Sequence, residues 1–353
     1  MIKSNSKNHK NGKNKSKSNK KSSKKSSKKM NDNPKKLQQK EKKINNRVLE
    51  LKTTQTGALK QVIERLSNFI SDCCIVFIPP NTSTVNNIDD DYYEEMDYLD
   101  DDAKASFEND IKMTNEKDKN STQKGTTGGI RIIRLTEDKS ILVKVILDAA
   151  NFEYFRCDEP KIIIGVDMHN FNNLLKPIKD DDPITLYMNK DNRSFLFIKS
   201  SRESDSSSDE IEIKLNLLEL PNPEIPLPPT EFQNKITIAS DKFHTTCKQL
   251  NNNSTHVELT AVNNQISLKG QNEGGSITIT FKDINCNKKK NHTNQIVQGV
   301  YELKNLMGFS KCTKLCNTID VYLKNNFPLV LVIAVATLGK MYVFLTPMED
   351  SNY

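Results

Sequence analysis

Short runs of apolar residues, several of them alternating with polar residues, dominate the first half of the sequence and predict β-strands. The predicted strands are 48–51, the continuous apolar run 74–78, 130–135, 141–147, 152–157, 184–188, 195–198 and 211–217. Two other stretches repeat their apolar residues at helical spacing, from Leu59 to Ile70 and from Met168 to Ile178. Asp167 directly precedes the second stretch, so we expect it to cap that helix.

The second half repeats this order of elements. Strands are predicted at 235–238, 257–262, 266–269, 277–281, 295–301, 319–323, 328–335 and 340–345. Helices are predicted over Phe243–Leu250, with Ser240 as the cap, and over Leu303–Ser310. Each half therefore combines two amphipathic helices with a larger number of short strands. This pattern indicates an α+β fold of two similar domains, each with antiparallel sheets.

A proline-rich segment separates the two halves. Residues 221–230 contain five prolines, which cannot join a β-ladder and favour a stiff, extended connector. We therefore expect a first domain over 48–220, a connector over 221–234, a second domain over 235–349 and a short tail over 350–353.

The charge is concentrated in two segments outside these elements, although the whole chain carries a net charge of only +7. Residues 1–45 hold 17 Lys against two acidic residues, and residues 81–128 hold 13 acidic residues against five Lys. We expect residues 1–47 to be a disordered basic tail and residues 81–128 to be a disordered acidic insert in the first domain. The tail is either a nucleic-acid-binding arm or nuclear address, or a solvated tail without a specific role. The remainder is neutral, which excludes a uniformly basic protein that coats DNA.

The sequence has no recognisable catalytic or cofactor-binding pattern. Its glycine-rich segments, 125–129 and 270–275, lack the Lys-Ser/Thr pair and the helix of a phosphate-binding loop. The one grouping of zinc-ligand types, Cys286, His292, Cys312 and Cys316, matches none of the usual structural spacings. Cys312 and Cys316 are instead expected to pack four residues apart on a helix. We therefore expect no enzyme, no cofactor and no metal site.

The pattern also favours an intracellular protein without a membrane span. The most apolar run, Phe327–Ala336, is too short to cross a bilayer. The Lys-rich start lacks the apolar core of a secretory signal. An odd number of cysteines, seven, is typical of reduced thiols inside a cell.

A series of short motifs runs through both halves in a fixed order. They are Phe152–Asp158, Ile164–Asp167, Leu174–Lys176, Asp182–Leu186, Ile213–Leu215, Ile225–Pro229 with Glu231 and Phe232, Phe327–Val330, Leu338–Gly339 and Leu345–Pro347. In this order and spacing, over 48–80 and 129–349, the chain resembles the proliferating cell nuclear antigen (PCNA) family of DNA sliding clamps. Its Lys/Asn-rich composition and insertions are typical of a divergent member, resembling those of large DNA viruses.

The resemblance implies a ring of three chains, in which helices line the hole and sheets form the outer wall. Basic residues on the helix faces then meet DNA phosphates and read no bases. The candidates at matching positions are Lys60, Arg65, Lys176, Lys179, His244, Lys248 and Lys311. Other inner positions that are basic in the family are Gln61, Ser67, Asn173 and Thr245 here.

The family closes its ring by pairing an edge strand of domain one with an edge strand of domain two on the next subunit. An unpaired edge is an aggregation hazard, so pairing around a closed ring is a physical solution. The matching interface residues are Ile211, Ile213 and Leu215 on one strand and Ile277, Ile279 and Phe281 on the other.

The resemblance also implies a pocket that receives the PIP-box peptide of client proteins, between the connector and the C-terminal segment. The matching residues are Leu135, Lys139, Ser140, Leu142, Ile225, Leu227, Phe232, Pro328, Phe344, Thr346 and Pro347. Lys139 stands where the family usually has a His, and Pro226 stiffens the connector further.

We therefore predict a homotrimeric DNA sliding clamp, a processivity factor for DNA polymerase in replication and repair. Its expected partners are double-stranded DNA of any sequence, DNA polymerase and other PIP-box proteins, and an ATP-driven clamp loader. Its expected location is the nucleus, or the site of viral DNA replication if the protein is viral. Two alternatives stay open: a subunit of a heterotrimeric checkpoint-type clamp, and a monomeric DNA-binding scaffold that acts through the basic tail. Self-trimerisation would distinguish the prediction from both.

Overall fold

The computed structural model describes residues 46–80, 128–203, 208–222, 225, 232, 234–262, 265–282, 296–312 and 314–348. Nearly all of the predicted basic tail and acidic insert, much of the connector and the C-terminal tail lie outside the described residues. The predictions made for those segments therefore stay predictions.

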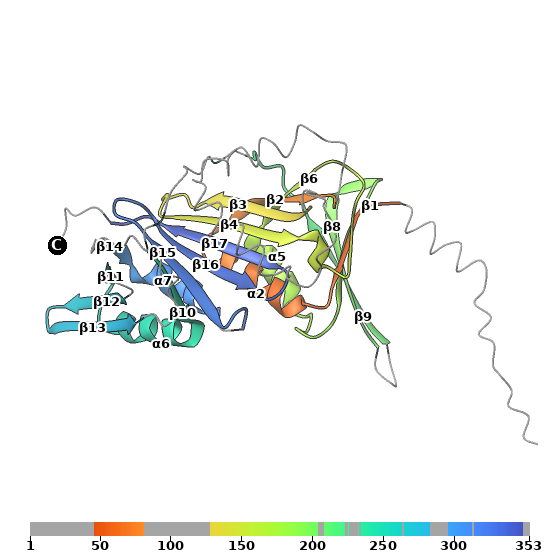
Figure 1. Ribbon diagram of the computed structural model, residues 1–353. Helices are drawn as coiled ribbons and strands as arrows, with labels where there is room; N and C mark the ends of the chain where they lie inside the picture. Colours follow the sequence, from red (N-terminus) through yellow and green to blue (C-terminus); the bar gives the residue numbers. More distant parts are fainter. Residues whose placement is uncertain are drawn as a thin grey trace, which may run out of the picture. The chain divides into compact units, whose positions relative to one another are not determined.

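The first half contains nine strands, two α-helices and a short 3-10 helix in its described part (Figure 1). In chain order they are β1 (Arg47–Thr53), α2 (Thr56–Ser67), β2 (Asp72–Ile78), β3 (Gly129–Leu135), β4 (Ile141–Asp148), η1 (Ala149–Asn151), β5 (Tyr154–Cys157), β6 (Ile162–Asp167), α5 (Met168–Leu175), β7 (Ile184–Asn189), β8 (Asn192–Glu203) and β9 (Ser208–Asn216). The second half follows the same plan. Its elements are β10 (Asn234–Ala239), α6 (Ser240–Asn251), β11 (His256–Val262), β12 (Gln265–Asn272), β13 (Gly275–Lys282), β14 (Val297–Glu302), α7 (Leu303–Ser310), β15 (Thr318–Leu323), β16 (Leu329–Val335) and β17 (Gly339–Leu345).

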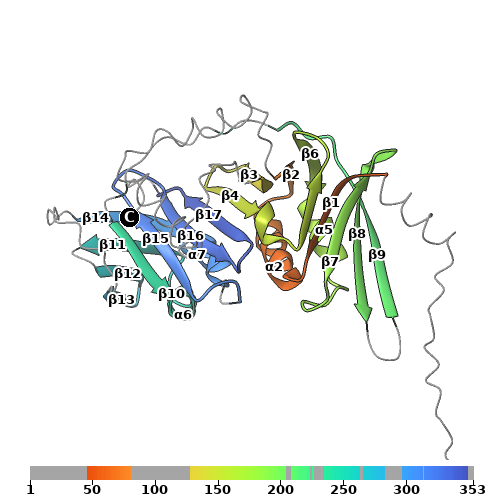
Figure 2. The same ribbon diagram turned by 45° about the vertical axis from the view of Figure 1, so that its right-hand side comes forward.

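The strands form three antiparallel sheets, and one of these sheets draws on both halves of the chain. The first-half sheet has the order β5-β1-β7-β8-β9, and Figure 2 shows the long β8–β9 hairpin at its edge. The second-half sheet has the order β13-β12-β11-β14. The shared sheet has the order β10-β15-β16-β17-β4-β3-β2-β6, so β17 of the second half pairs directly with β4 of the first.

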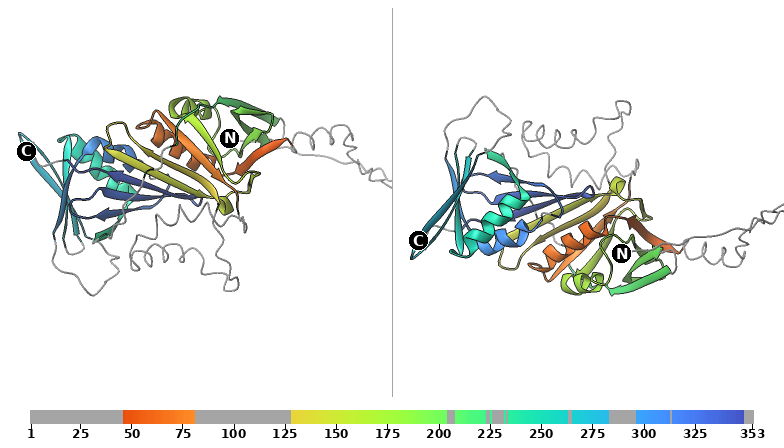
Figure 3. Two further views of the ribbon diagram at one scale, coloured as in Figure 1. Left: turned by 90° about the horizontal axis from the view of Figure 1, so that it is seen from above. Right: turned by 90° about the horizontal axis from the view of Figure 1, so that it is seen from below.

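The four α-helices in the described part of the chain bury one face each against a common core. In α2 the buried apolar side chains are Leu59, Val62, Ile63 and Leu66, at the helical spacing that the sequence predicts. Figure 3 shows α6, α7, α2 and α5 following one another on the same side of the sheets. Buried residues from both halves form one continuous hydrophobic cluster. Within the described residues, no helix has the length and apolar character that a membrane span requires.

The α+β class, the four helices and the antiparallel sheets agree with the sequence-based expectation. Asp167 also caps α5 as predicted, because its carboxylate accepts a hydrogen bond of 2.7 Å from the backbone N–H of Asn170. The sequence pattern did not predict β6 as a strand or the sheet shared between the halves.

Four local expectations were wrong. Helix α2 ends at Ser67 rather than near Ile70. Helix α5 ends at Leu175 rather than near Ile178, so Lys176 and Lys179 follow the helix. Ser240 is the first residue inside α6, not its cap, and its hydroxyl lies 3.6 Å from the sulfur of Cys316. Helix α7 ends at Ser310, so Cys312 and Cys316 lie on the segment that follows it.

Gly339 allows β17 to approach β4 closely at the seam between the halves. A Cβ atom at this position would lie 2.0 Å from the carbonyl oxygen of Ile146. We expect Gly339→Ala to lower the free energy of unfolding by about 1–3 kcal/mol, because the clash forces the backbone at this seam to shift. Chemical denaturation measures the change. Gly274→Ala is the matched control, since only the side chain of Asn272 lies near its Cβ, and an equal loss in both variants would contradict the prediction.

Candidate functional site

Three of the predicted partner-site residues, from two segments far apart in the sequence, lie in one row across the shared sheet. Leu135 lies opposite Leu142, and Leu142 lies opposite Phe344. The row continues from Phe344 to Val330 and from Val330 to Tyr322. Directly opposite residues on antiparallel strands project to the same face of a sheet, so this row forms one apolar strip over β3, β4, β17, β16 and β15.

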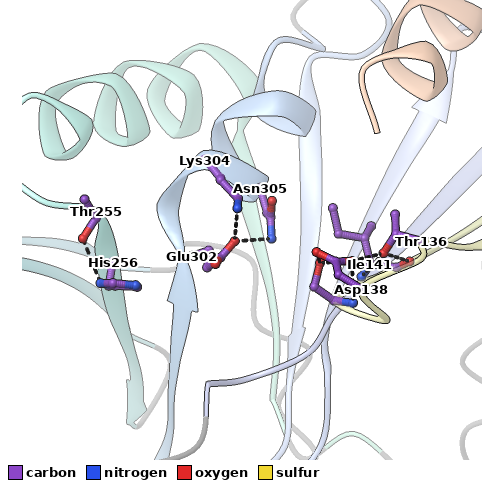
Figure 4. A network of polar contacts seen from close by, with 9 residues as sticks. Thr136, Asp138, Ile141, Thr255, His256, Glu302, Lys304 and Asn305 are labelled. Atoms are coloured by element: carbon purple, nitrogen blue, oxygen red, sulfur yellow. Dashed lines mark hydrogen bonds and ion pairs between the residues drawn. The ribbon is translucent and has the colours of Figure 1, made fainter. Parts of the chain in front are cut away.

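The turn between β3 and β4 forms one wall beside this strip and is held by Asp138. The Asp138 carboxylate accepts hydrogen bonds from the hydroxyl of Thr136 at 2.6 Å and from the backbone N–H of Ser140 at 3.1 Å. These bonds lower the pKa of Asp138, and the nearby charge of Lys304 lowers it further (Figure 4). Lys139 adopts a positive φ of 57°, and its side chain is exposed at the tip of the turn.

The segment after β17 is fastened to the same turn. Thr346 donates from its backbone N–H to the carbonyl oxygen of Ser140 at 3.0 Å. Its hydroxyl donates to the carbonyl oxygen of Lys139 at 3.1 Å. The turn and the C-terminal segment therefore behave as one structural unit, with Pro347 half-buried directly after Thr346.

Phe232 marks the other end of the strip. Its ring lies edge-on to the rings of Tyr322 and Phe327, each with centroids 5.5 Å away. Phe327 directly precedes Pro328, so the predicted residues Phe232 and Pro328 are neighbours in space. Ile225 is half-buried, and Leu227 lies outside the described residues.

Sequence reasoning missed three residues of this strip: Tyr322, Phe327 and Val330. Phe327 and Val330 belong to a motif that carries the family resemblance, and Tyr322 occupies an alternate position of a predicted strand. The signal was therefore present, but only the register of β15 on β16 assigns Tyr322 to this face.

Two of the predicted DNA-facing charges are used within the chain. The Lys60 ammonium donates to the carbonyl oxygen of Ile178 and forms a 2.9 Å ion pair with Asp180. Arg65 is only 9% exposed and lies beside Glu64. Because these charges are paired or buried, Lys60 and Arg65 are less available to DNA phosphates than the sequence suggests.

The other predicted basic residues remain accessible. Lys176, Lys179, Lys248 and Lys311 are exposed, and His244 is half-buried. Lys314, which the sequence reasoning did not select, is also exposed, and its charge lowers the pKa of Asp180 after the stronger effect of Lys60. The exposed charge of the helix face therefore lies mainly at the ends of α5, α6 and α7.

Helices α2 and α7 meet where the two halves join. Phe69, directly after α2, stacks on Phe309 of α7 with centroids 4.7 Å apart. Gly308 makes room for this contact, because a Cβ atom there would lie 2.0 Å from the Phe69 ring. The contact brings Arg65 of one half near His244 of the other.

His244 lies in a positive field at this junction. Its Nδ1 atom lies 3.0 Å from the hydroxyl of Ser310. Burial lowers the pKa of His244, and the charges of Lys311, Lys248 and Arg65 lower it further, while Asp241 opposes them. The same charges that disfavour a proton on His244 favour an anion at this surface.

The predicted subunit-interface residues lie on two edge strands. In the described part of the chain, β9 pairs only with β8, and β13 pairs only with β12. On β9, the side chains of Ile213 and Leu215 are buried, and Ile211 is half-buried. On β13, Ile277 is 38% exposed, whereas Ile279 and Phe281 are half-buried. Both edges therefore offer unpaired backbone groups beside apolar side chains.

No group of three or more His, Cys, Asp or Glu side chains is placed to hold a metal ion among the residues that the structure describes. Cys286 and His292, two of the four zinc-ligand types considered from the sequence, lie outside this part of the chain.

Comparisons with known proteins decide the family. The model of "Proliferating cell nuclear antigen, N-terminal domain" matches residues 112–222, and that of "Proliferating cell nuclear antigen, C-terminal domain" matches residues 226–348. The chain belongs to the PCNA family. The N-terminal match begins after β1, α2 and β2, yet β1 pairs with β5 and β7, so these elements are integral to the same fold.

Two relatives illustrate the range of similarity. The chain is 58% identical over 309 residues to a "Probable DNA polymerase sliding clamp" of Acanthamoeba polyphaga mimivirus, which covers 87% of this chain. It spans only 63% of the length of that relative. It is 25% identical over 224 residues to a "Proliferating cell nuclear antigen" of Chaetomium thermophilum, covering 62% of this chain and 85% of the relative.

The positive charges around His244 lead to a testable prediction about its pKa. We expect Lys311→Gln to raise the pKa of His244 toward its ordinary value, because the substitution removes a neighbouring positive charge. Titration of the His244 ring followed by NMR measures this shift. Lys304→Gln is the control, because Lys304 lies beside Glu302 and Asp138 and should leave His244 unchanged.

The same group makes stability depend on pH. Native His244 binds its proton at lower pH than the unfolded chain does, so stability falls as the pH drops below the ordinary His pKa of about 6.5. His244→Gln should reduce this acid-side loss. An unchanged loss in H244Q would contradict the assignment.

Proposed function

We propose that this chain is a subunit of a DNA sliding clamp, in which three copies close head to tail around duplex DNA. The ring tethers DNA polymerase without catalysing a reaction itself. Family membership and the similarity to the probable DNA polymerase sliding clamp of the mimivirus support this function. The observation that carries it is the pairing of β17 with β4 inside the chain, which supplies a template for pairing β9 with β13 between chains.

The two halves repeat the same strand orders. The order β1-β7-β8-β9 in the first half corresponds to β10-β15-β16-β17 in the second. The order β4-β3-β2-β6 corresponds to β13-β12-β11-β14. Strand β9 is therefore the counterpart of β17, and β13 is the counterpart of β4. Since β17 and β4 pair within the chain, their counterparts are equivalent surfaces that lack a partner among the described residues.

Residue-level equivalence follows for β13 and β4. Ile75 and Leu259 each lie nine residues after the last buried Leu of the preceding helix. Across the ladders, Ile75 leads to Ile132 and then Val145, and Leu259 leads to Leu268 and then Ile279. Val145 of β4 therefore corresponds to Ile279 of β13.

A matching pair of hydrogen bonds relates β9 to β17. The N–H of Leu218 donates to the carbonyl oxygen of Gly165, three residues before α5, and the N–H of Met348 donates to that of Val300, three residues before α7. Leu218 is therefore the counterpart of Met348. Counting back five residues from each, Ile213 of β9 corresponds to Val343 of β17.

The inner pairing sets the register of the proposed outer one. Val343 lies opposite Val143 within the chain, and Val143 corresponds to Ile277, so Ile213 of one subunit lies opposite Ile277 of the next. The antiparallel continuation places Ile211 opposite Ile279 and Leu215 opposite Gly275. Four of the six interface residues predicted from the sequence thus form two cross-strand apolar pairs, the contacts that stabilise a sheet.

This register predicts a specific cross-link between subunits. Lys214 and Ser276 are exposed and fall opposite each other, so the double variant Lys214→Cys with Ser276→Cys should form disulfide-linked dimers and trimers on mild oxidation. Electrophoresis without reductant shows them. The pair Lys214→Cys with Thr280→Cys is the control, because its cysteines lie four residues out of register. Equal linking in both pairs would overturn the register.

Mass in solution distinguishes the ring from its alternatives. Light scattering should give three times the 40.2 kDa of one chain at near-physiological salt. A single-chain mass at all accessible concentrations would reject the homotrimer and favour a heterotrimeric clamp or a scaffold. Deletion of residues 1–47 should leave the trimer and its topological retention on DNA intact, whereas it would abolish DNA association by a tail-driven scaffold.

DNA binding by this ring is electrostatic and independent of sequence. The exposed Lys176, Lys179, Lys248, Lys311 and Lys314 supply diffuse positive charge near the helix ends. Such charge holds phosphates without gripping a base, which permits sliding. An ATP-driven loader opens the ring, and the protein acts where DNA is replicated, in the nucleus or at a site of viral replication.

The apolar strip is the proposed site for PIP-box peptides of polymerase and other clients. Leu135, Leu142 and Phe344 offer an apolar floor, and Phe232 and the turn at Lys139 stand at its two ends. The connector residues Ile225 and Leu227 complete the proposed site. A pre-formed apolar surface keeps the ordering cost of peptide binding low.

Removing the central aromatic ring tests this site. Phe344→Ala should weaken binding of a fluorescent synthetic PIP-box peptide by roughly fivefold or more, about 1 kcal/mol, because an aromatic anchor is lost. Fluorescence anisotropy measures the affinity. Ile163→Ala is the matched control, since Ile163 is 44% exposed on β6 at the far edge of the same sheet. Peptide binding that is insensitive to F344A would place the client site elsewhere.

A further inference from the structure

Two cysteines meet on the segment between α7 and β15. The sulfur atoms of Cys312 and Cys316 are 4.0 Å apart, although both thiols are free. The backbone brings them together, because the N–H of Cys316 donates to the carbonyl oxygen of Cys312 at 3.1 Å. Cys312 is fully buried, whereas Cys316 is half-buried. A small reagent can therefore reach Cys316 first.

Cys316 is surrounded by groups that stabilise a thiolate. The Ser240 hydroxyl lies 3.6 Å from its sulfur, at the first turn of the twelve-residue helix α6. The start of α6 is held against this segment by a 2.9 Å hydrogen bond from the Ser240 N–H to the carbonyl oxygen of Asn317. A helix N-terminus carries partial positive charge, and thiols placed there are more acidic.

Contact with the Cys312 thiol, 4.0 Å away, lowers the pKa of Cys316 to about 7, the Ser240 hydroxyl and the N–H groups of Ala334 and Thr318 lower it further, and burial opposes these effects. The same contact and burial raise the pKa of Cys312. Burial raises the pKa of Cys73 and of Cys247 to about 12. Cys316 is therefore the activated sulfur among these thiols, and Cys312 is its protonated neighbour.

We propose that Cys316 and Cys312 form a peroxide-reactive dithiol, with Cys316 as the attacking sulfur and Cys312 as the resolving sulfur. The proposal does not rest on the clamp function, because it concerns only the chemistry of these two thiols. It assigns a modification site whose substrate class is hydrogen peroxide or a small organic hydroperoxide.

The reaction has two balanced steps. The Cys316 thiolate attacks a peroxide oxygen, so an S–O bond forms, the O–O bond breaks, and the departing hydroxide or alkoxide takes up the proton that Cys316 released to solvent when it ionised. Cys312 then attacks the sulfur of this sulfenic acid. An S–S bond forms, the S–O bond breaks, and the leaving hydroxide takes the Cys312 proton to become water. One peroxide is reduced to two waters, or to water and an alcohol, while two thiols become one disulfide.

Closing the bond changes the local backbone. The sulfur atoms must approach from 4.0 Å to about 2.05 Å. Leu315, between them, is 5% exposed and donates its N–H to the carbonyl oxygen of Cys312 at 2.7 Å. Lys311 and Lys314 lie on this same segment and are exposed. Forming the disulfide therefore shifts the backbone that carries these two charges.

Peptide mapping tests the proposal directly. Every variant carries Cys286→Ser, because Cys286 lies outside the described residues. After brief peroxide treatment, trypsin should release the peptide Cys312–Lys314 joined by a disulfide to the peptide Leu315–Lys324, since trypsin cuts after Lys311, Lys314 and Lys324. The intact protein should lose two hydrogens. Absence of the linked peptides, or linkage of other cysteines instead, would overturn the proposal.

Single variants separate the two roles. In Cys312→Ala, Cys316 should stop at the sulfenic acid and be trapped by a dimedone-type reagent, whereas in Cys316→Ala the reagent should label neither position. Limited alkylation of the untreated protein at neutral pH should modify Cys316 at least about tenfold faster than Cys247. Equal rates for the two thiols, or trapping at Cys312 in C316A, would reject the assignment.

Discussion

The ladder between β17 and β4 is the interaction on which the rest of the structure depends. It joins four strands from each half into one eight-stranded sheet, so the halves cannot move apart without breaking main-chain hydrogen bonds. Gly339 lets the two backbones approach, and the Phe69–Phe309 stack supports the junction from the helix side. The apolar strip crosses this ladder at Leu142 and Phe344, so the proposed client site exists only because the halves are joined here.

The same ladder gives the proposed ring its geometry. Each chain contains two copies of one strand order, and one of the two possible edge pairings is already made internally. Three copies that repeat the pairing close a ring of six similar units and cover every such edge. A closed ring also leaves none of these strand edges exposed to solvent. In the proposed ring, the pairing between chains therefore repeats the strand pairing that joins the two halves of one chain.

The arrangement of charge fits the proposed loose hold on DNA. Lys60 is paired with Asp180 and Arg65 is buried, while exposed lysines gather near the helix ends and around His244. A surface of dispersed, solvated charges attracts phosphates over a Debye length but forms few fixed contacts. The dithiol at Cys312 and Cys316 lies on the segment that carries Lys311 and Lys314, so a change of thiol oxidation would act within this surface.

The sequence by itself determined the α+β class, nearly every strand and the four helices, because periods of two and 3.6 residues are local signals. It also determined the family resemblance, since motif order is a property of the chain. Tertiary structure alone decided that Leu135, Leu142 and Phe344 share one face, because their register depends on hydrogen bonds between distant strands. It alone paired Lys60 with Asp180, 120 residues away, and ended α7 before Cys312. Local patterns do not encode such contacts, because burial and long-range pairing select one arrangement among many that the same alternation allows.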